Sequence, residues 1–260
     1  MKYSIITCTY NSSEYLEKNI LSVKNQNFQD FEHIFIDGFS TDETVNIIKK
    51  YQEEFPNQVK FFQFKAEGIS KAMNQGVMES TGEYIIHLHS DDSLYDNKVL
   101  DDTTSFLEKN KYPDWIYGKI NVLKKDKSNG IFPTKDIWQK KDGDFIKNYL
   151  LKYYNYIPHQ AVFIKKTVFE KFGYFDETLK CGMDPDLWLR IRTKTRWFFF
   201  DRIISNYSIR AGAQSSGLKN KGENNEEFRM IKKRYLNKAE LIFASILNLM
   251  LKFKKDNYQK

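Results

Sequence analysis

The sequence predicts an α/β fold with a mostly parallel central sheet covered by helices, and two observations lead to this prediction. Strand-like and helix-like segments alternate four times between Tyr3 and Asp92, which is the pattern of a parallel sheet with helices on its faces. Polar residues follow the strand-like segments at their carboxyl ends, where sheets of this kind bind ligands.

The individual elements follow from local patterns. The expected strands are apolar or β-branched runs, namely Tyr3–Thr9, Phe31–Ile36, Val59–Phe64, Tyr84–His89, Trp115–Leu123 and Ala161–Lys165. Helices are expected at Ile69–Ser80, Thr167–Phe172 and Glu226–Leu251, and after Asn11–Glu14 and Ser40–Glu43, which have the spacing of a helix-capping box. The segment Ala211–Asn225 is rich in Gly, Ser, Asn and Lys, which predicts a loop.

Composition and charge restrict the class of protein. Hydrophobic residues make up 41% of the chain and aromatic residues 16%, enough for a sizeable core, so global disorder is excluded. The net charge of +7 is too mild to indicate a nucleic-acid binder. The two cysteines, Cys8 and Cys181, have no CxxC spacing, so we expect buried thiols in a reducing compartment and no structural zinc.

The C-terminal part differs from the rest, and we expect a first domain at residues 1–212 and a basic extension at 213–260. From Ala239 to Phe253 the polar residues form one narrow helical stripe, comprising Glu240, Ser245, Asn248 and Lys252. Such a helix packs on the domain or a partner, or lies in a membrane interface, and both readings stay open. We interpret the lysines at Lys232–Arg234 and Lys252–Lys255 as a surface that attracts phosphate-bearing ligands or anionic lipid.

The sequence also predicts where the protein resides. Met1 leads directly into a strand-like run without a signal peptide, and no apolar run reaches the length of a membrane span. We expect a cytoplasmic protein whose C-terminal helix is a candidate peripheral contact with the cytoplasmic face of the inner membrane.

Two acidic positions at strand ends have a specific chemical interpretation. A carboxylate at Asp37 can accept the ring N–H of uracil, thymine or guanine, and Asp91 can hold Mg²⁺ or Mn²⁺ bridging a diphosphate. Each has an alternative explanation, with Asp37 as a turn former before Gly38 and Asp91-Asp92 as a cap. Their joint occurrence at matching strand ends favours a nucleotide site.

Several motifs in order carry a resemblance to a known family. They are Ser4–Asn11, Ile36–Asp42, Gly68–Gly76, Ser90–Asp92, His159-Gln160, Gly173–Glu177 and Asp184–Arg190. Over roughly residues 3–212 the chain resembles the family-two glycosyltransferases of GT-A fold, the kind acting in bacterial surface polysaccharide biosynthesis. The resemblance implies a Rossmann-like GT-A sheet.

On the donor side, the resemblance implies roles for five positions. Thr7, Thr9 and Asn11 would line the nucleotide-sugar pocket, Asp37 would bind the base, and Asn74 would lie near the ribose and phosphates.

On the metal and acceptor side, the resemblance places Asp91 at the metal-binding position of the Asp-x-Asp motif and Asp184 at the position of the catalytic base. Trp188 and Arg190 would support the Asp184 helix, and Trp188 would also lie on the acceptor or phosphate side of the site. His159 would contact the donor phosphates or the acceptor, and these two alternatives stay open. Asp184 also has the alternative reading of a helix N-cap, since Pro185 follows it.

The resemblance implies an inverting, Mn²⁺- or Mg²⁺-dependent hexosyl or N-acetylhexosaminyl transferase that uses a nucleoside-diphosphate sugar, with a UDP-sugar as the first choice. Inversion needs a base on the acceptor oxygen and charge neutralisation on the departing diphosphate. The implied acceptor is a lipid-linked or surface glycan, such as a lipopolysaccharide precursor.

The sequence lacks the motifs that two competing classes of protein need, and a third class stays open. A dehydrogenase needs a Gly-rich turn after the first strand, which is absent. A nucleotidyltransferase usually has a Gly-rich loop with Lys or Arg near the N-terminus, also absent. A non-catalytic sugar-nucleotide-binding member stays open, because Phe39, His89-Ser90 and Met183 depart from the family pattern.

Overall fold

The computed structural model describes residues 1–124, 127–133, 148, 151–153, 155–209, 221–242 and 244, with the backbone alone at 221–225. Its elements alternate along the chain as β1 (Tyr3–Thr9), α1 (Ser13–Lys24), β2 (Phe31–Asp37), α2 (Thr44–Glu54), β3 (Val59–Gln63), α3 (Ile69–Glu79) and β4 (Tyr84–His87). The second half contains β5 (Ser93–Leu94), α4 (Val99–Lys109), β6 (Trp115–Lys124), β7 (Lys127–Phe132), β8 (Val162–Lys165), α6 (Lys166–Phe172), α7 (Met183–Ile191), β9 (Trp197–Ile209) and α8 (Lys221–Tyr235).

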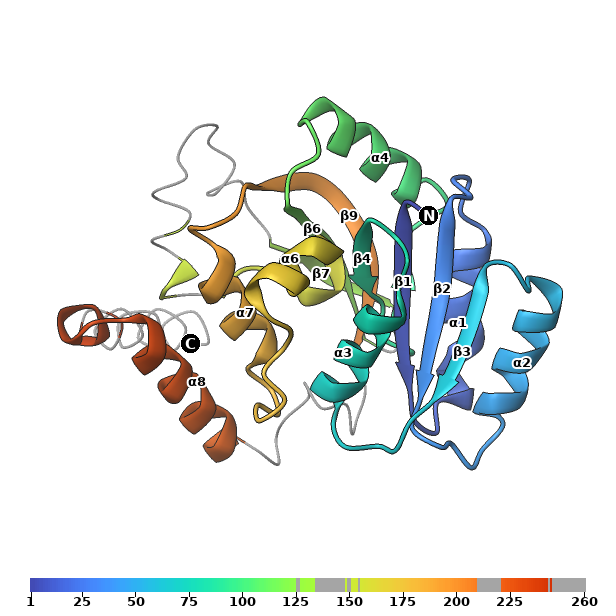
Figure 1. Cartoon of the computed structure of the whole chain (residues 1–260), viewed down its shortest axis with the longest axis horizontal. Helices are drawn as coiled ribbons and strands as arrows, with labels where there is room; N and C mark the ends of the chain where they lie inside the picture. Colours follow the sequence, from blue (N-terminus) through green and yellow to red (C-terminus); the bar gives the residue numbers. More distant parts are fainter. Residues whose placement is uncertain are drawn as a thin grey trace.

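The strands form one mixed sheet in the order β3-β2-β1-β4-β8-β6-β9-β5, and β7 pairs with β6. The first four strands in this order are parallel, whereas β8 runs antiparallel to both β4 and β6. The predicted α/β fold with a mostly parallel sheet is therefore confirmed. Figure 1 shows the β1–β3 region with α2 at one end of the molecule and α7 with α8 at the other.

Helices cover both faces of the sheet, because alternate strand residues point to opposite sides. Ile6 of β1 packs in one core cluster with Met73 and Val77 of α3. The neighbouring Ile5 packs in a second cluster that includes Leu100 of α4. This layering leaves the carboxyl ends of β1, β2 and β4 as the place where polar side chains collect.

The two predicted capping boxes are wrong in detail. Helix α1 begins at Ser13 and α2 at Thr44, and neither has a side-chain cap from its own N-cap residue. Instead the Asp42 carboxylate accepts the backbone N–H of Ser13 and the backbone N–H of Thr44, both at 3.1 Å. One carboxylate thus serves the first turns of both helices, and it ties the loops that follow β1 and β2 together.

The C-terminal expectations need correction where the structure describes them. The predicted loop 211–225 is wrong at 221–225, because α8 begins at Lys221; residues 210–220 lie outside the described residues. The predicted helix 226–251 is interrupted after Tyr235, and a new helical turn starts where Asn237 and Glu240 cap each other's backbone N–H groups. Ser245, Asn248 and Lys252 of the expected polar stripe lie outside the described residues.

The described part of the extension packs on the rest of the chain. Ile231 of α8 is buried in the main core cluster, and Leu236 and Ala244 pack against Tyr153. Arg234 is paired with Asp176 and Asp186, so it does not belong to an open basic surface as we expected. The domain boundary at 212/213 remains a prediction. None of the described helices is long and apolar enough to cross a membrane.

Candidate active site

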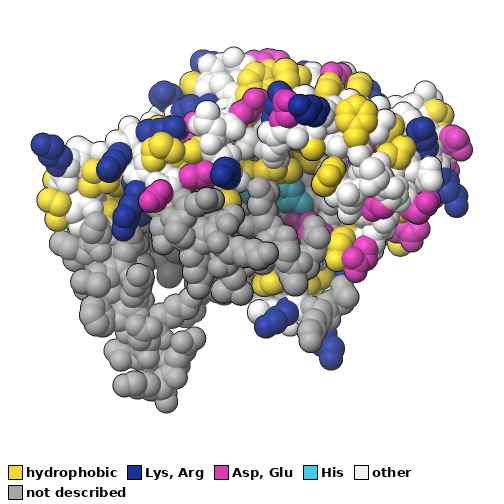
Figure 2. Space-filling model, turned by 90° about the horizontal axis from the view of Figure 1, so that it is seen from below, with side chains coloured by type: hydrophobic (Ala, Val, Ile, Leu, Met, Phe, Trp, Pro, Cys, Tyr) yellow, Lys and Arg dark blue, Asp and Glu magenta, His cyan; other side chains and the backbone are white. Residues whose placement is uncertain are grey.

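A cavity of about 750 Å³ lies at the carboxyl ends of β1, β2 and β4 and extends to the start of α7. Its lining includes Cys8, Thr9, Tyr10, Asp37, Gln75, His89, Asp91, His159, Lys180, Asp184 and Phe228. Seen from below, histidine side chains are visible in a hollow of the surface beside acidic and hydrophobic ones (Figure 2). The volume is in the range of small-molecule sites.

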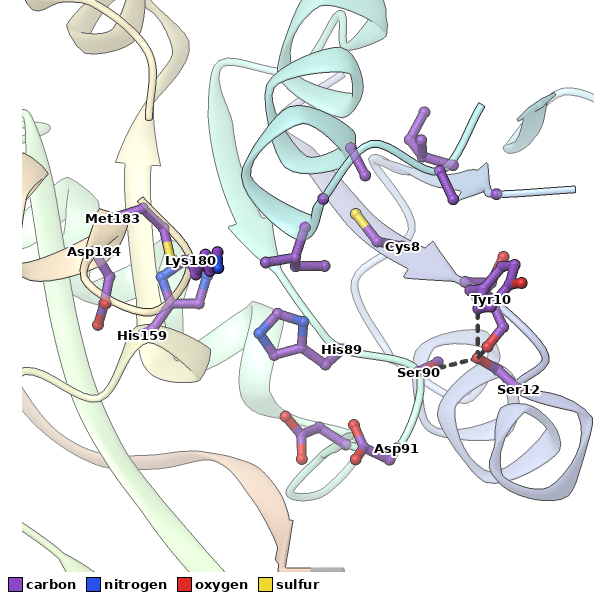
Figure 3. A pocket seen from close by; sticks show the side chains of 18 of the residues that line it. Cys8, Tyr10, Ser12, His89, Ser90, Asp91, His159, Lys180, Met183 and Asp184 are labelled. Carbon is purple, nitrogen blue, oxygen red and sulfur yellow. Dashed lines mark hydrogen bonds between the residues drawn. The ribbon is translucent and has the colours of Figure 1, made fainter. Parts of the chain in front are cut away.

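The walls of the cavity come from two distant parts of the chain. Figure 3 shows Cys8, Tyr10 and Ser12 on one side and Asp184, Met183, Lys180 and His159 on the other, with His89 and Asp91 between them. We call the part built by residues 8–75 the donor wall and the part built by residues 155–184 and Phe228 the acceptor wall.

Asp37 is the central acidic residue of the donor wall, and its carboxylate already has several donors. Oδ1 accepts the hydroxyls of Thr9, at 2.9 Å, and of Ser40. Oδ2 accepts the Ser40 backbone N–H at 2.9 Å and the Gln63 amide at 3.1 Å. These four bonds hold the carboxylate in a fixed orientation at the end of β2.

Of the predicted donor residues, the structure brings Thr9 and Asp37 into the cavity lining, but not the other three. Thr7 is buried, and its hydroxyl donates to the Leu88 carbonyl at 2.8 Å because Thr7 points from β1 towards β4. Thr7 is therefore not among the residues that line this cavity.

Asn11 and Asn74 also lie outside the cavity lining, and each makes hydrogen bonds that connect parts of the fold. Asn11 accepts the Thr41 backbone N–H at 2.9 Å, which fastens the loop after β2. Asn74 of α3 is buried; its amide donates to the Phe175 carbonyl at 3.0 Å and its Oδ1 accepts the Phe175 N–H at 2.9 Å. Asn74 thus joins α3 to the segment that leads into α7, and Gln75 faces the cavity in its place.

The Asp91-Asp92 pair lies just beyond β4, and its two members have different surroundings. Both line the cavity, but Asp92 is buried and accepts the Ser208 backbone N–H at 3.0 Å, which fixes it to β9. Among the described residues, no group of three His, Cys, Asp or Glu side chains forms a metal cluster. A single carboxylate with diphosphate oxygens and water is a usual ligand set for Mg²⁺, so Asp91 fits the predicted cation.

Asp184 lies in the first turn of α7, on the acceptor wall. Burial raises the pKa of its carboxyl to about 7, although hydrogen bonds from its own backbone N–H and from the Asn155 side chain act in the opposite direction. A carboxyl group with a pKa near neutrality can both accept and release a proton at physiological pH, which suits a general base.

Trp188 and Arg190 pack α7 from its buried side. Trp188 does not line the cavity; it is buried and stacks on Trp115 at 5.3 Å between ring centroids. The Arg190 guanidinium donates to the carbonyls of three consecutive residues before α7, at 2.9 to 3.0 Å, namely Phe172, Gly173 and Tyr174. These contacts fix the helix relative to the sheet.

His159 lies on the acceptor wall with both ring nitrogens buried and without a hydrogen-bond partner among the described residues. Its ring stacks on His87 at 5.4 Å and on His89 at 5.6 Å. Burial and these two histidines hold its pKa well below 6.5, so the imidazole is neutral. A neutral imidazole offers one N–H donor and one acceptor nitrogen to the cavity.

Sequence reasoning missed several lining residues, among them Lys65, Gln75, Asn155, Lys180, Tyr207 and Phe228. Lys180 and Phe228 carry no motif signal, because one lies in a turn before α7 and the other in a C-terminal helix brought back by the fold. Only their contact with the Asp184 turn in three dimensions identifies them.

A parallel sheet whose strand ends carry Asp37 and Asp91, faced by a helix that carries Asp184, defines the class as a GT-A-type transferase. The profile of Glycosyl transferase family 2 matches residues 4–173, and the chain belongs to this family. It is a glycosyltransferase.

Several known proteins are similar to this chain. A PGL/p-HBAD biosynthesis glycosyltransferase of Mycobacterium tuberculosis is 29% identical over 80% of this chain and 71% of its own length. An uncharacterised glycosyltransferase of Rickettsia typhi is 26% identical over 99% of this chain and 81% of its own length.

Among solved structures, S. aureus TarS 1–349 in complex with UDP-GlcNAc matches with a TM-score of 0.71 and 23% identity over 89% of this chain. This chain spans 65% of the length of that TarS fragment. The mannosyltransferase PcManGT from Pyrobaculum calidifontis, in complex with GDP-Man and Mn²⁺, matches with a TM-score of 0.59 and 14% identity over 83% of this chain and 59% of its own. Both matches establish the fold.

Proposed function

We propose that the protein is an inverting, metal-dependent glycosyltransferase that moves a sugar from a nucleoside-diphosphate sugar to an acceptor hydroxyl, with Asp184 as the base. One observation carries the proposal: Asp184, with its pKa raised to about 7, faces across one cavity the strand ends that hold Asp37 and Asp91. The proposed donor site and the proposed base therefore lie on opposite walls of the cavity.

The chemistry follows from this division. The acceptor hydroxyl gives its proton to the Asp184 carboxylate while its oxygen attacks the anomeric carbon from the side opposite the diphosphate. The bond from that carbon to the diphosphate oxygen breaks, and the diphosphate leaves towards the Asp91 side. Because no covalent sugar–enzyme intermediate forms, one carboxylate is enough as base.

Asp91 is the residue that would hold the divalent cation, with Mn²⁺ or Mg²⁺ as candidates. Such a cation neutralises the charge that develops on the departing diphosphate. PcManGT is described in complex with Mn²⁺, and this relative supports the assignment. Lys65 and Lys180 add positive charge to the same cavity.

A UDP-sugar is the proposed donor. The Asp37 carboxylate at the end of β2 accepts N–H groups, so it suits the ring N–H of uracil or guanine and rejects a base that lacks a donor at that edge. TarS is described in complex with UDP-GlcNAc and PcManGT with GDP-Man. The greater similarity to TarS favours uridine.

A donor screen tests the proposal. Release of nucleoside diphosphate from UDP-, dTDP- and GDP-sugars is followed with Mn²⁺, with and without EDTA. We expect release from a UDP-sugar that is lost with EDTA, in Asp91→Ala and in Asp184→Asn. Asp30→Ala is the matched control, because Asp30 is an exposed aspartate outside the cavity. No release from any donor by the unaltered protein would overturn the proposal.

We further propose a lipid-linked or surface glycan as the acceptor, met at a membrane surface. The mycobacterial relative is named for PGL/p-HBAD biosynthesis. Met230 of α8 and Ile242 are exposed apolar side chains, and Lys233 and Lys238 are exposed nearby. Apolar and basic side chains on one surface suit an anionic interface.

The membrane contact is tested by sedimentation with phosphatidylglycerol vesicles, using phosphatidylcholine vesicles for comparison. We expect Lys233→Glu with Lys238→Glu to abolish binding to the anionic vesicles. Lys49→Glu with Lys50→Glu, on the distant helix α2, makes the same charge change and should leave binding intact (Figure 1). Equal loss in both pairs would mean that net charge alone is responsible, and the contact through α8 would be rejected.

A further inference from the structure

Helix α8 contacts the turn that leads into α7 through a single carboxylate. Glu227 accepts the backbone N–H of Lys180 at 2.8 Å with Oε1, and those of Cys181 at 2.9 Å and Gly182 at 3.2 Å with Oε2. Gly182 is the N-cap position of α7, and Lys180 and Cys181 precede it, so these donors lie in the turn before the helix and outside its own hydrogen-bond pattern. Here one side chain from another element takes all three.

The helix cannot provide this cap itself. Its N-cap position is Gly182, which has no side chain, and α7 has no side-chain cap bond. A Cβ atom at Gly182 would lie 2.3 Å from Cδ1 of Ile231, so a Ser, Thr, Asp or Asn cap at this position would require the Ile231 side chain to move. The close approach of α8 also brings Glu227 over the turn.

Asp184 is the carboxylate of α7 that stands nearest in sequence to these donors. It lies in the first turn of α7 and already accepts its own backbone N–H. A carboxylate at a helix start turns towards free N–H groups, which lowers its pKa and directs it away from the cavity. Because Glu227 occupies the donors of residues 180–182, the Asp184 carboxylate is left on the cavity wall.

A second set of contacts holds α8 in place, one turn or two further along. Arg234 donates to Asp176 at 2.7 Å and to Asp186 at 3.2 Å, and the Tyr235 hydroxyl donates to Asp186 at 2.9 Å. Phe228, adjacent to Glu227, lines the cavity. Helix α8 is thus held against α7 and the turn before it from its middle and from its C-terminal end, and it forms part of the acceptor wall.

We propose that Glu227 is a positioning residue for Asp184: by capping the turn 180–182 from α8, it keeps the base directed at the acceptor and basic enough to take the proton. This inference rests on the proposed function, since it assigns a task to Glu227 in the same reaction. It makes the C-terminal extension part of the active site rather than an appendage.

The test compares Glu227→Ala and Glu227→Gln with Glu226→Ala, which removes the exposed neighbouring carboxylate from the same helix. The reaction followed is the release of UDP from UDP-GlcNAc with water as acceptor, or the same release from the donor that the screen identifies. Water loses its proton to Asp184 and attacks the anomeric carbon, so no acceptor need be known. Rates are measured from pH 5 to pH 9, and folding is checked by thermal melting.

For Glu227→Ala we expect kcat to fall about tenfold to a hundredfold, as for a misplaced catalytic group, with the donor KM within a factor of two. The acid limb of kcat should move to lower pH, because N–H groups released from Glu227 become available to the Asp184 carboxylate. Glu227→Gln, which keeps a carbonyl oxygen for the turn, should lie between Glu227→Ala and the unaltered protein. Lys180 and His159 face Asp184 in the cavity (Figure 3) and are unchanged in these variants.

The outcomes separate the inference from the function on which it rests. If the unaltered protein releases UDP and Glu227→Ala matches it in kcat and pH profile, the inference is overturned and the transferase stands. The same holds if Glu226→Ala shows an equal fall, or if the fall in Glu227→Ala leaves the acid limb in place. If the unaltered protein turns over no donor, the proposed function and the inference both fail.

Discussion

The polar side chains on the two walls of the cavity differ in how many hydrogen bonds they receive from the protein. On the donor wall, Asp37 accepts four hydrogen bonds from protein groups. On the acceptor wall, both ring nitrogens of His159 have no partner among the described residues, and the Asp184 pKa is raised by burial. The acidic residue of the donor wall is held by several protein donors, whereas His159 on the acceptor wall has none among the described residues.

The same contrast recurs within one helix. Asp184 and Asp186 are two positions apart on α7, but Asp186 accepts bonds from Arg190, Arg234 and the Tyr235 hydroxyl, at 2.9 to 3.2 Å. A carboxylate with two cations and a hydroxyl stabilises the fold, while one with few donors costs stability and gains reactivity. The partners, not the residue type, determine which role a carboxylate has.

The largest expected effect is the loss of the base. Asp184→Asn keeps the size of the side chain but cannot accept the acceptor's proton, so we expect kcat to fall by about 10² to 10⁴ with the donor KM nearly unchanged. Nucleoside-diphosphate release measures both constants. Full activity in Asp184→Asn would remove the contrast between the two carboxylates of α7.

Asp186→Asn should act on stability instead. The Asp186 side chain is 3% exposed, and its replacement leaves two arginines with a neutral partner, so we expect a loss of about 2 kcal/mol in the free energy of unfolding. Urea denaturation measures it. Asp176→Asn, which removes a more exposed partner of Arg234, is the matched control and should cost less than about 1 kcal/mol. Equal losses in the two variants would contradict the assigned role of Asp186.

The pH dependence of stability should also distinguish Asp184. Its pKa is about 7 in the folded protein and 3.8 in the reference state, so the folded state binds the proton more tightly. The unaltered protein therefore loses stability as the pH rises from about 4 to about 7, by about 2 kcal/mol for a partly exposed carboxyl. Asp184→Asn lacks this loss. Urea denaturation at pH 4.5 and pH 8 measures the difference, and parallel curves for the two proteins would contradict the raised pKa.

His159→Phe is expected to raise stability and lower activity. Two buried nitrogens without partners among the described residues are replaced by an apolar ring, which we expect to stabilise the fold by about 1 kcal/mol. We expect turnover to fall, because the resemblance places the imidazole against the donor phosphates or the acceptor. His33→Phe is the matched control, because the buried His33 ring bonds Thr7 at 3.0 Å. It should destabilise the protein. A loss of stability in both variants would show that His159 has a structural role.

How far the sequence could predict this site depends on whether the signal is local. The strands β1, β2 and β4 and the acidic residues after them were predicted correctly, because hydrophobic runs and strand ends are read along the chain. Helix α4 and strand β9 were not predicted. Thr7 and Asn74 match the family motif, yet their side chains turn to Leu88 and Phe175, which only the packing of the sheet determines.

The contribution of α8 to the site could not be predicted from the sequence, for a related reason. Glu227 lies 43 residues after Asp184, and no periodicity or motif links the two positions. The predicted basic surface at Lys232–Arg234 was inferred from charge alone, whereas Arg234 forms salt bridges with Asp176 and Asp186. Interactions between elements distant in sequence appear only when the fold brings their surfaces together.

The smallest expected effect concerns strain on the donor wall. Phe39 has a backbone φ of 61° and an exposed side chain, a conformation that costs a bulky residue roughly 1 to 2 kcal/mol. It does not line the cavity, so Phe39→Gly should relieve the strain without touching the donor. After the entropy that glycine adds to the unfolded chain, we expect a gain of about 0.5 kcal/mol in the free energy of unfolding and a donor KM within a factor of two.

Tyr112→Gly, at a φ of 49° and away from the cavity, is the matched control for the backbone effect. A donor KM that rises severalfold in Phe39→Gly but not in Tyr112→Gly would mean that the loop after β2 moves onto the bound donor, and that the donor wall is less preformed than its hydrogen bonds indicate.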